Sequence, residues 1–128
     1  MSDKTVAEKL LIKEGYRVVI IDAPDGYLGN IGKLPHNVSL IETADGEADL
    51  IQLFVRSRQQ LEATLLSLKS VLKPKGLLWV TYPKGTSGLK VDINRDTINT
   101  YAQSLGLQGV AMISIDDTWS ALRLKHAR

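Results

Sequence analysis

The chain has 128 residues, of which 44% are hydrophobic and 23% are charged, and its formal net charge is +2. This length and composition fit one globular domain spanning residues 1–128, and so small a positive excess does not indicate a nucleic-acid-binding protein. The lack of cysteine excludes disulfides, thiolate metal sites and a thiol nucleophile. Charged residues interrupt segment 1–15 every few positions, which is typical neither of a signal peptide nor of a membrane span. We therefore expect a cytoplasmic domain that binds neither nucleic acid nor membrane.

The first half of the chain is predicted to hold one short helix and several strands. Thr5 and Glu8 have the spacing of a capping box, which predicts a helix that Gly15 ends. Apolar runs then predict three strands, over residues 17–23, 38–41 and 50–55. Between the second and third of these strands only polar turn residues occur.

The second half alternates helices and strands. Ser57 and Gln60 have capping-box spacing at the start of a leucine-rich helix that Pro74 and Gly76 end. The apolar segment 77–82 predicts a fourth strand. Asp92 or Asn94 can cap a further helix, which Gly106 ends, and the segments 109–115 and 118–125 predict a closing hairpin.

This order of elements predicts an α/β fold, a three-layer Rossmann-like sandwich. Its sheet should have about six strands, mostly parallel, with an antiparallel hairpin at the C-terminal end.

Several segments resemble known families. "ADLIQLFV" and "LKPKGLLWVTYPK" are similar to the second half of class I S-adenosylmethionine-dependent methyltransferases, in which an acidic residue opens the fourth strand and a turn like "LKPGG" precedes the fifth. Asp49 and residues 73–76 stand at those places. "GYRVVIIDAPDGY", "WVTYPK" and "DDTWSALR" resemble a bacterial family of short proteins of unknown function. The resemblance covers almost the whole chain and implies a methyltransferase-like fold without an established activity.

The segment after the first strand departs from the methyltransferase pattern. The family has an acidic residue followed by three alternate glycines, whereas Asp22 is followed by Pro24, Gly26 and Leu28 at those positions. Proline offers no N–H and fixes φ near −65°. Asp25 is predicted to cap the following turn, so that its carboxylate would repel an incoming anion. The glycines here are therefore predicted to shape a short turn rather than to cradle a phosphate.

A second departure concerns length. Segment 24–37 can hold at most about two helical turns, and the polar turn before Leu50 stands where a full methyltransferase sheet has a helix, a strand and another helix. The fold is thus predicted to lack its third strand and part of the usual cofactor pocket. The strand in "NVSLIET" then becomes an edge strand, which predicts a homodimer through that edge.

Ligands of such sheets bind at the carboxyl ends of the parallel strands. The candidate cofactor-binding residues there are Asp22, Asp25, Gly26, Glu42, Tyr82 and Lys84. A second set could converge on an anion, beside backbone N–H groups of "PKGTSG": Arg56, Arg58, Lys84, Thr86 and Ser87, joined by Lys90 and Arg95. Glu42 is either a carboxylate for ribose hydroxyls or a solvated charge. Tyr82 is either a lid over the crevice or an aromatic residue of an interface.

The closing hairpin has a distinctive cluster of its own. Trp119 and Leu122 are predicted to pack inward, and Arg123 is predicted to pair with a carboxylate. His36 and His126 have no partner at metal-ligand spacing, so no catalytic residue and no metal ligand is assigned.

Together these observations predict a methyltransferase-like domain that has lost catalysis and binds a small anionic or nucleotide-like ligand or a protein partner. No cofactor is assigned, and S-adenosylmethionine is the one that the resemblance implies. The alternative is a small S-adenosylmethionine-dependent methyltransferase or nucleotide-using enzyme, which the polar strand ends would support.

Overall fold

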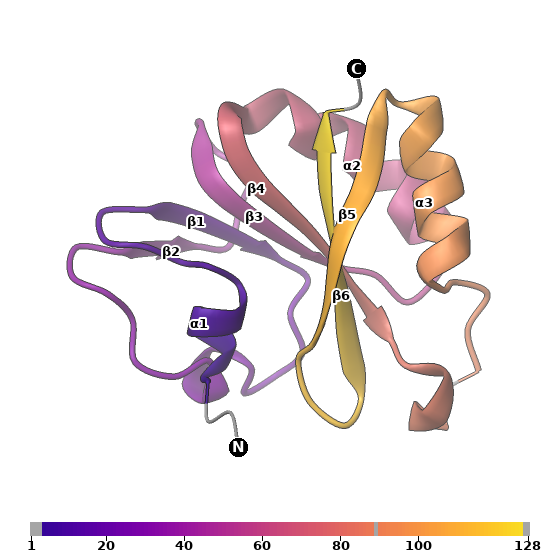
Figure 1. The fold of residues 1–128 in the computed structure, drawn as a ribbon, viewed down its shortest axis with the longest axis horizontal. Coiled ribbons are helices and arrows are strands. Elements are labelled where there is room, and N and C mark those ends of the chain that lie inside the picture. The colour runs from indigo at the N-terminus through magenta and orange to yellow at the C-terminus, as the bar shows by residue number, and fades with distance from the viewer. Residues whose placement is uncertain (1–3, 89, 127–128) are drawn as a thin grey trace.

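The computed structural model describes residues 4–88 and 90–126, which form one mixed sheet with helices on both faces (Figure 1). The strands are β1 (Arg17–Ile21), β2 (Ser39–Ile41), β3 (Ala48–Phe54), β4 (Leu72–Pro83), β5 (Leu107–Ser114) and β6 (Trp119–His126). The helices are α1 (Val6–Lys9), α2 (Arg58–Val71) and α3 (Arg95–Ser104), with short 3-10 helices at Leu28–Asn30 and Gly85–Ser87.

The six strands lie in the order β2-β1-β3-β4-β6-β5. Strands β2, β1, β3 and β4 are parallel, whereas β6 is antiparallel to both β4 and β5. The predicted α/β fold, with a mostly parallel sheet and a C-terminal hairpin, is therefore confirmed. Strand β2 lies at the edge of the sheet as predicted, and no strand follows it outward among the residues that the structure describes.

A short polar turn connects β2 to β3. The guanidinium group of Arg17 fixes this turn by donating hydrogen bonds to the backbone carbonyls of Asp45, Gly46 and Glu47. The chain thus returns from the edge strand β2 to the middle of the sheet over a polar turn that one side chain from β1 holds in place.

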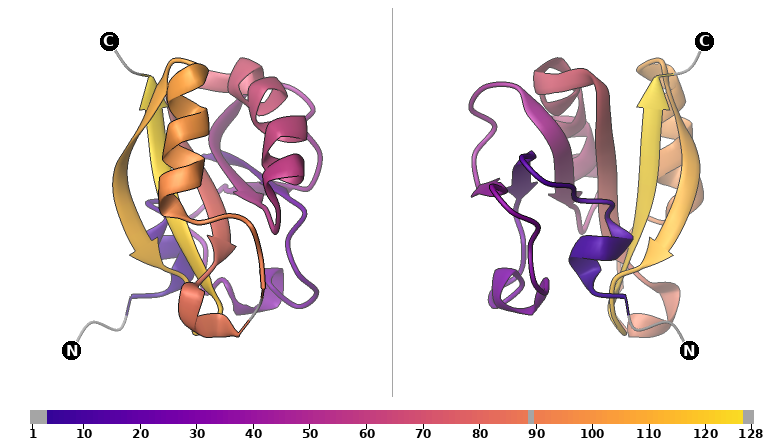
Figure 2. Two further views of the ribbon diagram at one scale, coloured as in Figure 1. Left: turned by 90° about the vertical axis from the view of Figure 1, so that its right-hand side faces the viewer. Right: turned by 60° about the vertical axis from the view of Figure 1, so that its left-hand side comes forward.

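The two faces of the sheet have separate hydrophobic cores. Leucines of α2 and apolar residues of α3 pack on one face, against residues such as Ile51 and Val80. The opposite face is covered by α1 and by the loop after β1, through residues such as Leu10, Tyr27 and Ile31. Figure 2 shows α1 on the side of the sheet opposite to α2 and α3.

The boundaries of two elements differ from the sequence-based expectations. Helix α1 ends at Lys9 rather than near Gly15, because Leu10 is its C-cap and Leu11 has a left-handed backbone with φ of 68°. The indole N–H of Trp79 donates to the Leu10 carbonyl at 3.0 Å and holds that helix end on the sheet.

Strand β4 begins at Leu72, well before the predicted start at residue 77. Leu72 pairs with Ala48 of β3, and an irregularity then separates this pair from the regular ladder that starts where Leu50 pairs with Leu77. Pro74 and Gly76 therefore lie in an irregular stretch of strand rather than in a loop.

Helix caps are mostly where the sequence places them. Thr5 and Glu8 form the expected capping box, and the Ser57 hydroxyl accepts the Gln60 N–H at 3.0 Å. Asn94, not Asp92, caps α3. The Asp92 carboxylate instead accepts the Arg58 N–H at the start of α2, at 2.9 Å.

Candidate functional site

The loop after β1 turns back over the sheet instead of leading into an α-helix. Asp22 and Gly26 have positive φ values of 61° and 81°, and the Tyr27 N–H donates to the Pro24 carbonyl at 3.1 Å. Only a 3-10 helix follows, at Leu28–Asn30, and it has no side-chain cap. The prediction that Asp25 caps this turn is wrong, because Tyr27 is the N-cap residue of the 3-10 helix and no side chain accepts a hydrogen bond from its first N–H groups.

Tyr27 fixes this loop to the sheet through a chain of buried hydrogen bonds. Its hydroxyl donates to Gln52 Oε1 at 2.7 Å, and Gln52 Nε2 donates to Thr81 Oγ1 at 3.0 Å. Gln52 and Thr81 are fully buried, and Tyr27 is 6% exposed. Burial raises the pKa of the Tyr27 hydroxyl far above its usual range, more than the Gln52 hydrogen bond lowers it. The hydroxyl therefore stays protonated and acts as a permanent donor to Gln52.

Aromatic packing extends this closure toward β6. The Tyr27 ring meets Phe54 edge to face at a centroid distance of 4.7 Å, and Phe54 meets Trp119 at 5.2 Å. The guanidinium carbon of Arg56 lies 5.0 Å from the centre of the Trp119 ring. A row of packed rings thus occupies this face of the sheet at the carboxyl ends of β3 and β4.

A cavity of about 400 Å³ remains at the carboxyl ends of β1 and β2. It is lined by Asp22, Asp25 and Glu42, by Gly26 and Gly29, and by neighbouring apolar residues, and no lysine or arginine belongs to this lining. All three acidic residues are exposed. Gln60 Nε2 donates to Asp22 Oδ2 at 3.1 Å and connects the cavity rim to α2. The structure therefore brings four of the predicted cofactor-binding residues together in an acidic cavity.

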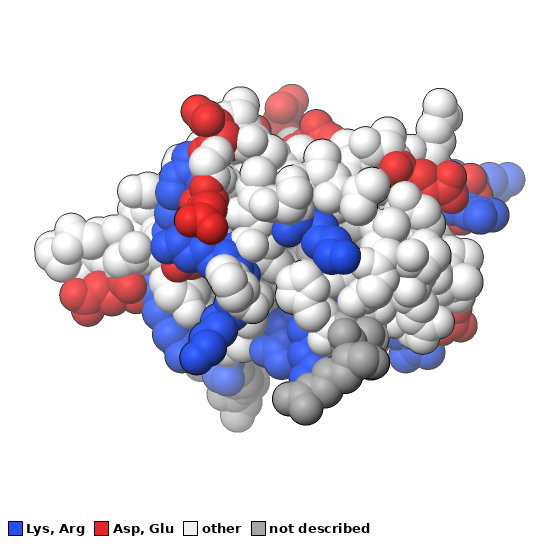
Figure 3. Space-filling view, turned by 90° about the horizontal axis from the view of Figure 1, so that it is seen from above, with Lys and Arg blue, Asp and Glu red and all other residues white. Residues whose placement is uncertain are grey.

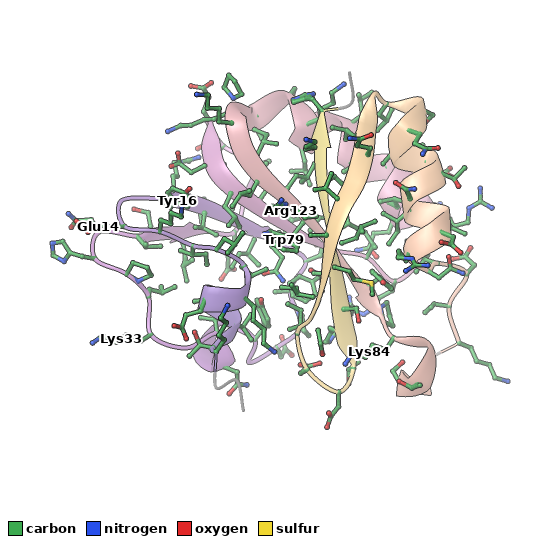
Figure 4. All side chains as sticks on the ribbon, in the orientation of Figure 1. Glu14, Tyr16, Lys33, Trp79, Lys84 and Arg123 are labelled. Atoms are coloured by element: carbon green, nitrogen blue, oxygen red, sulfur yellow. The ribbon has the colours of Figure 1, made fainter. Side chains whose placement is uncertain are left out.

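The other two predicted cofactor-binding residues lie elsewhere. Tyr82 and Lys84 line a separate cavity of about 620 Å³ beyond the end of β4, together with segment 90–94. Lys84 Nζ donates to Ser114 Oγ at 2.7 Å, which holds it near the closing hairpin. In Figure 4, Lys84 lies near the end of β4, far from Glu14 and Tyr16 at the opposite side of the molecule.

The predicted anion-binding residues do not converge on one point. Arg56 lies over Trp119, whereas Arg58 contacts Glu62 at 3.6 Å and lines a groove against α3. Lys84 lines the cavity beyond β4, and Thr86 and Ser87 belong to the 3-10 helix after it.

Asp49, which stands at the methyltransferase-like acidic position, has structural partners. Its carboxylate accepts the Arg17 N–H at 2.8 Å and lies 3.0 Å from Lys73 Nζ. Burial raises the pKa of this carboxyl group, but the Arg17 hydrogen bond and Lys73 outweigh burial and lower it below its usual value. These contacts join the start of β3 to β1 and β4.

The hairpin cluster is partly as predicted. Trp119 and Leu122 are buried, on opposite faces of the sheet. The Asp116 carboxylate accepts the N–H groups of Thr118 and Trp119 and so shapes the turn. Arg123 pairs with no carboxylate in the part of the chain that the structure describes, which corrects the prediction. It lies beside Trp79, its partner across the β4–β6 ladder (Figure 4).

Charge is unevenly distributed at the opposite end of the parallel strands. Figure 3 views the molecule from above, where β3 and β4 begin, and shows many of the lysine and arginine side chains gathered toward the left of that view.

Within residues 4–88 and 90–126, no group of three or more acidic, histidine or cysteine residues could hold a metal ion. No helix among the described residues is long and apolar enough to cross a membrane.

The sheet order, the helices and the position of the cavity define a methyltransferase-like α/β fold, and comparisons with solved structures agree. A ribosomal protein L11 methylase from Lactobacillus delbrueckii subsp. bulgaricus is similar, with a TM-score of 0.61 and 15% identity over 94% of this chain and 74% of that one. DhpI in complex with SAH gives 0.66 and 12% identity over 95% and 82%. A TehB-like SAM-dependent methyltransferase from Corynebacterium glutamicum gives 0.60 and 11% identity over 98% and 89%. At these identities the likeness establishes the fold.

The family follows from the sequence. Residues 33–128 match the model of the family described as a protein of unknown function (DUF3052), and the chain belongs to that family. None of the curated proteins matches it. The family match begins after the loop that lines the acidic cavity. Of the residues that line this cavity, those from Ile20 to Gly29 lie outside the match and Glu42 lies inside it.

Sequence reasoning missed the residue that decides the shape of this site. Tyr27 stands next to a glycine in the expected turn, and Gln52 is the one uncharged polar residue within the apolar segment 50–55. An isolated glutamine in a buried strand requires a hydrogen-bond partner, which was the available signal. The identity of that partner depends on how the loop folds back.

Proposed function

We propose that this chain is a non-catalytic, methyltransferase-like domain that binds a small ligand in the acidic cavity at the carboxyl ends of β1 and β2. The observation that carries this proposal is the buried chain from Tyr27 through Gln52 to Thr81, because it ties down the loop that a methyltransferase uses to hold its cofactor. A loop anchored by fully buried polar partners does not open without leaving those partners unsatisfied.

The charges of the cavity indicate which ligand it would hold. Carboxylates accept hydrogen bonds but donate none when ionised, so Asp22, Asp25 and Glu42 favour a ligand rich in hydroxyl or amino groups. The same three charges disfavour a phosphate or a free carboxylate, because no lysine or arginine lines the cavity. A neutral nucleoside, whose ribose carries a vicinal diol, fits this chemistry better than a nucleotide does.

Gly29 supplies a direct way to test where the ligand lies. A Cβ placed on Gly29 would meet no atom within 4 Å, and its φ is not positive, so the fold does not require glycine there. Gly85 has the same two properties and lies in the other 3-10 helix, away from the acidic cavity. Gly29→Ala should therefore narrow the cavity without disturbing the fold, and Gly85→Ala is its matched control.

The experiment is an NMR titration of the whole chain with ribonucleosides and with their 2′-deoxy forms. At least one ribonucleoside should shift the amide signals of Gly26 and Gly29 saturably, its deoxy form should bind more weakly, and Gly29→Ala should weaken binding while Gly85→Ala does not. If no ribonucleoside shifts these signals at millimolar concentration, or if both alanine variants bind like the parent chain, the proposed ligand class and site are wrong.

The second candidate function is a small S-adenosylmethionine-dependent methyltransferase or nucleotide-using enzyme. The observations that favour it are the similarity to structures such as the DhpI–SAH complex and the presence of Asp22, Gly26 and Glu42 in a cavity at the strand ends. The methyltransferase requires that S-adenosylmethionine bind, and the nucleotide-using enzyme requires that a nucleotide bind. The first candidate function requires neither, so titrations with S-adenosylmethionine and with nucleotides separate the two.

A further inference from the structure

A second polar site lies at the carboxyl end of β4, around Tyr82. Two neighbouring hollows, of about 620 and 340 Å³, share Tyr82 and Asn94 in their walls. The larger hollow is also lined by Lys84 and Lys90, and the smaller one by Arg95. Three of the predicted anion-binding cations thus gather here, whereas Arg56 and Arg58 lie elsewhere.

Two acidic residues also line these hollows, Asp92 in the larger one and Asp96 in the smaller one. Asp92 Oδ1 accepts the Arg58 N–H at 2.9 Å, and Asp96 lies 3.4 Å from Arg95 Nε on the exposed surface. Lys90 has no carboxylate partner among the residues that the structure describes, and Lys84 is bound to the uncharged Ser114 hydroxyl. Three cations, Lys84, Lys90 and Arg95, thus line the two hollows beside two acids, Asp92 and Asp96, in contrast to the purely acidic lining of the cavity at β1 and β2.

Tyr82 has a hydroxyl whose partner in the protein is a weak one. The residue is 6% exposed, and its hydroxyl donates to the thioether sulfur of Met112 at 3.1 Å. A thioether is a poor acceptor, and a buried hydroxyl gains from a stronger one. Burial raises the pKa of Tyr82, so this hydroxyl remains protonated at neutral pH and can donate to an anion.

We propose that the paired hollows around Tyr82 bind an oxyanion of a small molecule, a phosphate or a carboxylate group, through the Tyr82 hydroxyl and the ammonium groups of Lys84 and Lys90. Charge-assisted hydrogen bonds to an oxyanion are the strong class of such bonds. In the complex the Tyr82 hydroxyl would donate to an oxygen atom of the ligand instead of to the Met112 sulfur. This site is independent of the proposed nucleoside site, because the two share no lining residue.

The test is a titration with inorganic phosphate and, separately, with acetate, at constant ionic strength and followed by amide NMR signals. One of the two anions should saturably shift the signals of residues 82–88 and 90–96 and leave those of Gly26 and Gly29 unchanged. Tyr82→Phe keeps the ring and removes the hydroxyl, and Lys90→Gln removes the exposed charge. Each should weaken binding about tenfold, the effect of losing one charge-assisted hydrogen bond.

Lys75→Gln is the matched control, because Lys75 is an exposed lysine at the opposite end of β4. It should bind the anion like the parent chain. The proposal is wrong if neither anion gives a saturable shift, if the shifts spread over all lysine-bearing surfaces, or if Tyr82→Phe and Lys90→Gln bind as tightly as Lys75→Gln. Nucleoside binding at the other cavity is unaffected by any of these outcomes, so a failure here does not count against the proposed function.

Discussion

Replacing Tyr27 by phenylalanine is predicted to destabilise the fold although it removes a single oxygen atom. The ring contact with Phe54 would remain, but Gln52 Oε1 would lose the hydrogen bond that it accepts at 2.7 Å. Gln52 is fully buried, so water cannot replace that partner. Leaving a buried polar atom unsatisfied costs about 1–3 kcal/mol. For a chain of 128 residues, each kcal/mol corresponds to a fall in Tm of about 4 °C.

The assay is thermal and urea unfolding of Tyr27→Phe beside Tyr101→Phe. The Tyr101 hydroxyl donates to the Glu62 carbonyl at 3.3 Å on the exposed surface, so its loss should change stability by less than about 0.5 kcal/mol. We expect a Tm lower by about 4–12 °C for Tyr27→Phe and almost no change for Tyr101→Phe. If the two variants have the same stability, the buried chain does not fix the loop, and the argument for a closed cofactor loop fails.

Two further predictions concern the stability of the fold, and a third concerns the oligomeric state. Asp49→Asn should lower the free energy of unfolding by about 1 kcal/mol near neutral pH. Because the pKa of Asp49 is lowered in the folded state, the stabilisation by its carboxylate is present above the usual pKa and should vanish as the pH falls through the pKa of the folded state. Urea unfolding across acidic pH tests this. Gly32→Ala should lower the free energy of unfolding by about 2 kcal/mol or more, because the φ of Gly32 is +97° and the new Cβ would lie 2.5 Å from the Thr5 Cβ. A Tm equal to that of Gly29→Ala would contradict this prediction. The homodimer through the edge strand β2 stays a prediction: light scattering should give twice the chain mass of 14.1 kDa, and a single species of 14.1 kDa at high concentration would exclude it.

The sequence predicts the elements of this fold better than it predicts the site. Leucines at helical spacing in α2 and the apolar runs of β1 and β3 are local signals, and the structure has each element near its expected place. The first residue of β4 could not be predicted, because Leu72 becomes part of a strand only by pairing with Ala48. The local sequence pattern gives no information about such a pairing.

The difference between local signals and contacts made only in the folded chain also explains which features of the site could be predicted. Asp22, Asp25, Gly26 and Glu42 line one cavity, as the sequence suggests, because the carboxyl ends of parallel strands meet at one edge of a sheet; that they bind a cofactor stays a prediction. The role of Asp25 as a cap was wrong because the loop continues to Tyr27 before any helical turn begins. The decisive contact joins residues 27 and 52, which only the folded loop brings together.

Calorimetric titration of the chain with S-adenosylmethionine tests the central claim most directly. With the loop after β1 held down by Tyr27 and with Pro24 at the position of the first glycine, we expect no measurable heat of binding. Binding with micromolar affinity would contradict the account, and it would make the methyltransferase the better description of this protein.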